Sequence, residues 1–325
     1  MSATSSRDPR IGVFDSGVGG LSVWREIVRQ LPGCDTVYVA DQAHIPYGPR
    51  PLEEVRQFAE GIAAFLIREG VAVVVVACNT ASAAALHHLR RRFPDIPFVG
   101  MEPAVKPAVQ RTRNGTVGVI ATPATFQGEL FASLLERFAQ NVRVIPQVCP
   151  GLVEAVEAGA LEVPETEALV RRCLEPLLEA GIDELVLGCT HYPFLRPLIE
   201  RVVGPGVEVI DPAPAVARQV RRVLEGAGYS EAALSVGIPR HVFFTTGDPA
   251  QFAGALSRLV GVTAKVDRLM WEDGNLRAEA EMSQGDSGAA ALRAASTFTP
   301  SCLPPGPPGC PLPPQSPPKS APSPR

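Results

Sequence analysis

The stretch VAVVVVACNT, from Val71 to Thr80, opens with seven consecutive apolar residues and closes with polar ones. A short run rich in β-branched residues is typical of a strand that is buried on both faces, as in parallel sheets covered by helices. The run is also far too short to cross a bilayer. Asn79 and Thr80 can cap a helix, so we expect Cys78 to lie at a turn from strand to helix.

Similar apolar runs alternate with longer amphipathic stretches from Ile11 to Val266, which predicts an α/β protein with mainly parallel strands. Between Leu52 and Glu69, for example, apolar residues recur at helical spacing and predict a helix that packs on a sheet. We expect strands at residues 11–14, 36–40, 71–77, 98–100, 116–121, 142–147, 184–188, 208–210 and 241–245. We expect helices at residues 21–30, 52–69, 81–93, 126–139, 165–180, 195–202, 213–225 and 249–260.

An internal repeat relates the two halves of this pattern. The residues IGVFD, at 11–15, are echoed by VGVIA, at 117–121, and the strand that ends at Cys78 is echoed by one that ends at Cys189. Because ligands gather at the carboxyl ends of parallel strands, we expect two pseudo-symmetric α/β domains that face each other across a central cleft. We assign residues 10–101 and 210–270 to the first domain, which carries Cys78, and residues 102–209 to the second, which carries Cys189.

The two ends of the chain lack this pattern. Residues 1–9 are predicted to be a flexible N-terminus, and residues 271–325 a disordered, proline-rich tail. Within the tail, residues 300–325 contain 12 prolines and almost no aliphatic side chains, which is too little apolar surface to fold. We interpret Cys302 and Cys310 as bystanders in this tail.

The overall charge and the cysteine spacing exclude several classes of protein. A net charge of −4 and a pI near 5.8 give no basic surface, so we expect no nucleic-acid partner. The polar N-terminus lacks the apolar segment of a signal peptide, and no run is long enough for a membrane, so we expect a cytoplasmic location. The seven cysteines should then be reduced thiols, and the lack of a Cys-x-x-Cys pair argues against a metal site.

Cys78 and Cys189 are the strongest candidates for chemistry. Each is followed by polar residues that begin a helix, where free backbone N–H groups favour an anion, either a thiolate or a bound carboxylate. A free thiol has a pKa of about 8.5, so such a position is expected to bring a thiolate within reach near neutral pH. A buried structural role is the alternative for each cysteine, but their equivalent positions in the repeat disfavour it.

Two loops that follow strands are expected to contribute binding groups. Glycines follow Asp15 and Ser16, but their spacing is not that of a phosphate loop, and Asp15 would repel a pyrophosphate. We expect the backbone N–H groups and the Ser16 hydroxyl to bind a carboxylate, while Asp15 interacts with an ammonium group or a catalytic thiol. The alternative is a turn with a purely structural role. The loop at residues 41–48 is expected to line the cleft, with His44 in a structural or lining position.

Five motifs, in order along residues 10–267, together resemble the bacterial glutamate racemases. They are IGVFDSGVGGLS at 11–22, the segment from Ala40 to Gly48, ACNTAS at 77–82, LGCTHYP at 187–193 and IDP at 210–212. The resemblance implies cofactor-independent interconversion of L- and D-glutamate, which supplies D-glutamate for peptidoglycan synthesis. It also implies that the enzyme is a homodimer. It does not extend to the tail.

The resemblance also implies a role for each motif residue. Cys78 and Cys189 would be the acid and base on opposite faces of the substrate, with Asp15 supporting Cys78 and His191 supporting Cys189. Glu157 would be a further assisting carboxylate, although Glu154 lies one turn away and remains an alternative. The implied substrate contacts are Asp15, Ser16, Tyr47, Gly48, Asn79, Thr80, Thr190 and His191.

Other mechanisms and functions make different demands on the sequence. A pyridoxal-phosphate racemase needs a lysine for its Schiff base, and the chain has only Lys106, Lys265 and Lys319, none beside a phosphate loop, so we expect no cofactor. An aspartate or hydantoin racemase would share the fold and the paired cysteines. A thiol redox protein would use the cysteines as a disulfide pair, and an amino-acid binding protein would use the cleft without chemistry.

Overall fold

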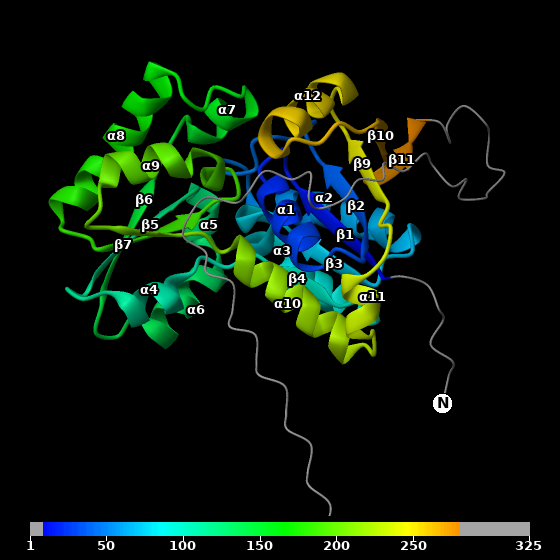
Figure 1. Ribbon diagram of the computed structural model, residues 1–325, viewed down its shortest axis with the longest axis horizontal. Helices are drawn as coiled ribbons and strands as arrows, with labels where there is room; N and C mark the ends of the chain where they lie inside the picture. Colours follow the sequence, from blue (N-terminus) through cyan, green and yellow to red (C-terminus); the bar gives the residue numbers. More distant parts are fainter. Residues whose placement is uncertain (1–8, 280–325) are drawn as a thin grey trace, which may run out of the picture.

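The computed structural model describes residues 9–279, which form two α/β units, each with its own sheet (Figure 1). The larger sheet has seven strands in the order β11-β10-β9-β2-β1-β3-β4. Its strands are β1 (Arg10–Asp15), β2 (Asp35–Ala40), β3 (Val73–Val76), β4 (Phe98–Gly100), β9 (His241–Thr245), β10 (Val266–Glu272) and β11 (Asn275–Ala278). All neighbours are parallel except β10 and β11, which form an antiparallel hairpin.

The smaller sheet has four parallel strands in the order β6-β5-β7-β8. Figure 1 shows it in green beside the larger sheet. Its strands are β5 (Thr116–Ala121), β6 (Arg143–Val148), β7 (Glu184–Gly188) and β8 (Glu208–Ile210). The prediction of an α/β fold with mainly parallel sheets is therefore confirmed. The division of the chain into domains at the stated residues stays a prediction.

Helices cover both faces of the larger sheet, and β3 shows why its sequence is apolar throughout. Val73 and Val75 belong to the buried cluster that includes residues of α1 (Leu21–Gln30) and α10 (Ala213–Gly226). Val74 and Val76 belong to a separate cluster with residues of α2 (Leu52–Arg68) and α3 (Asn79–Arg92). Since successive side chains of a strand point to opposite faces, an unbroken valine run satisfies both layers.

The remaining helices complete the two units. They are α4 (Val105–Arg111), α5 (Pro123–Gln127), α6 (Glu129–Phe138), α7 (Leu152–Glu157), α8 (Pro164–Glu179), the 3₁₀ helix η1 (Tyr192–Leu195), α9 (Arg196–Val203), α11 (Glu231–Ser235) and α12 (Pro249–Val260). The predicted helix at 126–139 is wrong in extent, because the extended backbone of Gly128 separates α5 from α6. The short helices α4, α7 and α11 were not predicted.

The folded part of the chain also extends further than predicted. The tail was expected to begin at residue 271, but β10 runs to Glu272 and β11 continues the sheet. The hairpin is folded because Leu276 and Ala278 are buried against the cluster beneath α2. Residues 1–8 and 280–325, and with them the rest of the predicted tail, lie outside the described residues. Within residues 9–279, no helix combines the length and apolar character that crossing a membrane requires.

Candidate active site

Cys78 and Cys189 line the same cavity, which has a volume of about 200 Å³. Cys78 follows β3 and caps α3, and its Sγ accepts a hydrogen bond of 3.5 Å from the backbone N–H of Ala81. Cys189 directly follows β7 in the other unit. The predicted site residues that line this cavity are Ser16, Tyr47, Gly48, Cys78, Asn79, Thr80, Cys189, Thr190 and His191.

Asp15 and Glu157 are not among the lining residues, and both are held by the glycine-rich turn after β1. Oδ2 of Asp15 accepts hydrogen bonds of 3.0 Å from the N–H groups of Gly17 and Gly20. Oε1 of Glu157 accepts one of 2.8 Å from the N–H of Val18. The expectation that this turn offers its amides to a ligand carboxylate is therefore wrong for these three amides, because carboxyl groups of the protein already occupy them.

Glu157, His191 and Cys189 form a connected chain of polar groups. The Nε2 atom of His191 lies 2.7 Å from Oε1 of Glu157, and its Nδ1 atom lies 3.7 Å from Sγ of Cys189. Burial lowers the pKa of His191, but the interactions with Cys189 and Glu157 outweigh it and raise the pKa well above its usual value. Burial raises the pKa of Glu157, but the bond to His191 reverses this, and the net shift is downward. The buried His191 and the half-buried Glu157 therefore form an ion pair that leaves an imidazole N–H for Cys189.

Glycines in the turn make room for this chain of groups. A Cβ atom on Gly17 would lie 2.1 Å from Oε1 of Glu157, and one on Gly19 would lie 2.4 Å from Nδ1 of His191. Both distances are far below van der Waals contact. The turn after β1, in the unit with the larger sheet, therefore packs directly against Glu157 and His191, which belong to the same unit as Cys189.

This close approach predicts the effect of Gly19→Ala. The added methyl group must displace the His191 ring or the turn itself, and displacing a catalytic group by about 1 Å costs on the order of a hundredfold in rate. Turnover should be measured together with the thermal midpoint. Gly226→Ala, at the end of α10, is the matched control, since a Cβ there meets no atom within 4 Å. A Gly19→Ala enzyme with unchanged turnover would contradict the packing described here.

Cys78 lies in a different electrostatic environment. Burial raises the pKa of its thiol well above the usual value, and the nearby carboxyl group of Asp15 raises it further. Its Sγ lies 3.9 Å from Oγ of Ser16. Burial also raises the pKa of Asp15 itself, although His191 and the turn amides oppose the rise. The bond from Ala81 lowers the pKa of Cys78, as expected at a helix N-terminus, but loss of hydration outweighs it, so the net shift is opposite to the expected one.

Asn79 and Thr80 begin α3 and line the cavity, but only the side chain of Thr80 has a hydrogen-bond partner among the described residues. Both polar atoms of the Asn79 side chain are buried without a hydrogen-bond partner among residues 9–279. Oγ1 of Thr80 lies 2.8 Å from Oγ1 of Thr122, which in turn lies 2.9 Å from that of Thr125. Since unpaired buried polar atoms are costly, the Asn79 amide is available to a polar ligand.

Thr122 is a lining residue that the sequence analysis did not select. It follows β5 and caps α5, as Ser16 follows β1. The signal was present, because the repeat aligns Ala121 with Asp15 and therefore Thr122 with Ser16. His44, by contrast, stacks on Phe58 with ring centroids 3.8 Å apart and is not among the lining residues.

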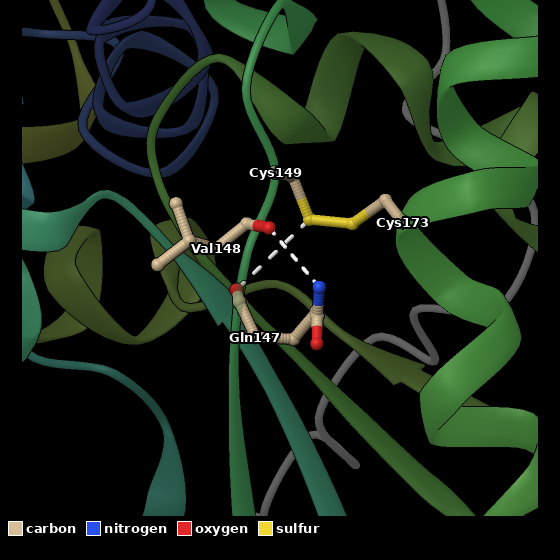
Figure 2. Close-up of a disulfide and its surroundings, with 4 residues drawn as sticks. All are labelled: Gln147, Val148, Cys149 and Cys173. Atoms are coloured by element: carbon tan, nitrogen blue, oxygen red, sulfur yellow. Dashed lines mark hydrogen bonds between the residues drawn. A yellow bond between two sulfur atoms is a disulfide. The ribbon is translucent and has the colours of Figure 1, made fainter.

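One wall of the cavity is formed by the end of β6, the start of α7 and the residues between them, and it includes one cysteine of a disulfide. Val148, Cys149, Pro150, Gly151, Val153 and Glu154 line this wall. Figure 2 shows Cys149 joined to Cys173 of α8. The expectation that every cysteine is reduced is therefore wrong for this pair, whose Cα atoms lie 5.4 Å apart, within the usual range for a disulfide. Cys78 and Cys189 are free thiols among the described residues.

Known proteins resemble this chain over most of its length. A family model described as Asp/Glu/Hydantoin racemase matches residues 11–220. A glutamate racemase of Roseiflexus sp. (strain RS-1) is 53% identical over 80% of this chain and 94% of its own length. One of Pseudomonas aeruginosa (strain PAO1) is 50% identical over 80% of this chain and 97% of its own length.

Solved structures give the same result. Glutamate racemase isoform RacE1 from Bacillus anthracis matches with a TM-score of 0.74 and 36% identity, over 82% of this chain and 98% of that one. The Escherichia coli glutamate racemase in complex with L-glutamate and the activator UDP-MurNAc-ala matches with a TM-score of 0.71 and 32% identity, over 81% and 99%. The architecture described above is thus the one these racemases adopt.

Proposed function

The chain belongs to the Asp/Glu/hydantoin racemase family, within which it groups with the glutamate racemases, and on this premise we propose that it interconverts L- and D-glutamate by proton transfer to and from Cys78 and Cys189. The observation that supports this mechanism best is that two free thiols, from equivalent strand ends of two α/β units, line one cavity. Neither thiol is committed to a disulfide.

Two opposed thiols suit the inversion of a stereocentre. The reaction removes a proton from one face of the α-carbon and delivers another to the opposite face, so one group must begin as thiolate and the other as thiol. The raised pKa of Cys78 keeps it a thiol near neutral pH, which is the form required to protonate the carbanion formed from L-glutamate. His191 presents its N–H to Cys189, which is the base in that direction.

The carbanion must be stabilised by groups that line the cavity. Oriented hydrogen-bond donors that meet a developing charge in a buried site are the usual source of such stabilisation. Asn79 has unpaired polar atoms, and the hydroxyl groups of Ser16, Thr80 and Thr190 also border the cavity. We propose that these groups hold the substrate together with Tyr47 and Gly48, and that Asp15 and Glu157 act from behind the cavity through Cys78 and His191.

The proposed mechanism uses no cofactor. A pyridoxal cofactor would need a lysine beside the reacting carbon. Lys106, on α4, lies with its Nζ 5.4 Å from the ring centroid of Phe138, and Lys265 pairs with Asp267 at 2.6 Å. Neither lysine is among the residues that line the cavity. This supports the proposal that the two cysteines exchange the α-proton.

Isotope exchange tests the proposed function directly. Chelator-dialysed protein is incubated with L-glutamate in deuterated water. The enantiomers are then separated, and the mass of each is measured by mass spectrometry. Early in the reaction, D-glutamate should carry one α-deuterium, because the proton is delivered by a solvent-exchanged thiol. Loss of activity on dialysis would contradict cofactor independence. Faster turnover of L-aspartate would point to another branch of the family, and a protein that binds glutamate without exchange would not be a racemase.

The cellular setting and the assembly are proposed from the family resemblance. We propose a cytoplasmic homodimer that supplies D-glutamate for peptidoglycan synthesis. Val236 and Ile238, whose side chains are 73% and 84% exposed, are large apolar groups on the surface of the described residues.

A further inference from the structure

The side chain of Asp41 is the centre of a hydrogen-bond network outside the cavity. Asp41 directly follows β2 and is fully buried. Its Oδ1 accepts bonds of 2.8 Å from Oγ1 of Thr246 and from Nε1 of Trp271. Its Oδ2 accepts a bond of 2.5 Å from the Tyr47 hydroxyl and lies 2.9 Å from Nδ1 of His44. One carboxyl group therefore holds two side chains of the loop that follows it and two from distant parts of the sequence.

Two of these partners belong to the loop that closes one side of the cavity. Tyr47 lines the cavity together with Pro46 and Gly48, while its hydroxyl points back to Asp41. His44 stacks on Phe58 of α2, and Tyr47 is 5.7 Å from the same ring. The position of the loop is thus set by Asp41 on one side and by the aromatic face of α2 on the other.

Trp271 reaches this network from the C-terminal hairpin, far from the loop in sequence. Its ring lies 5.9 Å from that of Phe58 and 5.3 Å from that of His44, between centroids. The ring fits because α2 carries glycine at position 61, where a Cβ would lie 2.6 Å from the indole. The absence of a side chain at Gly61 therefore lets the indole N–H reach Asp41.

We propose that Trp271 is a positioning residue for substrate binding: by donating to Oδ1 it orients the carboxyl group of Asp41, so that Oδ2 holds Tyr47 and the loop in their binding positions. The proposal rests on the proposed function only for the identity of the substrate. Without the indole, Oδ1 keeps one side-chain donor. A buried acceptor that loses a bond raises the free energy of the folded state, and a shift of Asp41 and its partners can relieve that cost. The C-terminal hairpin is then part of the binding machinery.

The test compares Trp271→Phe with Trp24→Phe in the full chain. Both replacements keep an aromatic ring and remove one indole N–H, but that of Trp24 donates to Oγ1 of Thr36 in the core of the first unit. Trp271→Phe should raise KM for glutamate about fivefold, with a smaller change in kcat, because the loop contributes uniform binding. Trp24→Phe should lower the thermal midpoint and leave KM unchanged. Equal KM values for both variants would overturn the proposal.

A double-mutant cycle asks whether the effect passes through Asp41. Tyr47→Phe removes the partner hydroxyl on Oδ2, so Trp271→Phe should raise KM less in that background than in the wild type. Fully additive effects would show that Trp271 acts by another route.

Backbone amide hydrogen exchange provides a readout that needs no substrate. In Trp271→Phe, the amides of residues 42–48 should exchange faster than in Trp24→Phe or the wild type. Unchanged exchange would overturn the proposal. A wild-type protein that does not turn over glutamate would overturn the proposed function, whereas this comparison would still decide the role of Trp271.

Discussion

Cys78→Ser and Cys189→Ser are each expected to lower the rate of glutamate racemisation about a thousandfold or more. A serine hydroxyl is a far poorer general acid and general base than a thiol near neutral pH. Enantiomers have equal free energies, so kcat/KM must fall equally in both directions and cannot separate the two roles. Exchange of the α-hydrogen with deuterated water can separate them. Cys78→Ser should still exchange L-glutamate through Cys189. Cys189→Ser should still exchange D-glutamate through the thiolate fraction of Cys78, but more slowly, because the raised pKa of Cys78 keeps that fraction small.

Cys34→Ser is the matched control for this experiment. Cys34 is also a buried cysteine, but it belongs to the apolar core and is not among the residues that line the cavity. Its replacement should leave both racemisation and exchange intact. If the Cys78 and Cys189 variants behave alike with both enantiomers, the thiols do not lie on opposite faces of the substrate, even if the protein is a racemase.

The positions of the two cysteines could be predicted because their signals are local. An apolar strand followed by capping residues is visible within about ten residues, and the repeat shows the pattern twice. The structure accordingly places Cys78 and Cys189 at the ends of β3 and β7. The nine strands predicted along residues 11–245 were found for the same reason.

The resemblance named Asp15, Glu157 and His191 beside the thiols, but the bonds that hold these groups could not be predicted, because they join distant residues. The N–H of Val18 bonds to Glu157, 139 residues away, and Trp271 bonds to Asp41, 230 residues away. The disulfide joins Cys149 and Cys173, whose separation of 24 residues matches no local motif. The raised pKa of Cys78 likewise follows from burial, whereas its sequence neighbours show only the favourable helix start.

The hairpin β10–β11 was missed for a different reason. Only Val266 and Leu269 of β10 are buried, and β11 has four residues, of which Leu276 and Ala278 are buried, so neither strand shows an apolar run that stands out from the tail. The hairpin is held in place by pairing of β10 with β9 at the edge of the sheet and by the contact of Trp271 with Phe58 of α2. Such tertiary contacts can stabilise a strand that has almost no pattern of its own.

Glu157→Gln is expected to lower kcat about a hundredfold and to shift the alkaline limb of its pH profile to lower pH. The carboxylate of Glu157 is one of the two groups that hold the pKa of His191 above its usual value. Without it, burial favours the neutral imidazole, so His191 loses its proton at a lower pH. The measurement is kcat as a function of pH for both enantiomers, followed by circular dichroism.

The same ion pair makes stability depend on pH. The pKa of His191 is raised, so its contribution is fully present below 6.5 and is lost as the pH rises through the raised value. The pKa of Glu157 is lowered, so its contribution is present above 4.5 and is lost as the pH falls through the lowered value. The thermal midpoints of the wild type and Glu157→Gln should therefore differ most between pH 4.5 and 6.5.

Glu154→Gln is the control that separates the two carboxyl groups of α7. Glu154 lies one turn before Glu157, is exposed and lines the cavity, whereas Glu157 bonds to His191. Its replacement removes the same charge from the same helix but leaves the ion pair intact, so the alkaline limb should stay at the wild-type pH. A shift of that limb in Glu154→Gln, with none in Glu157→Gln, would assign the assisting role to Glu154 instead.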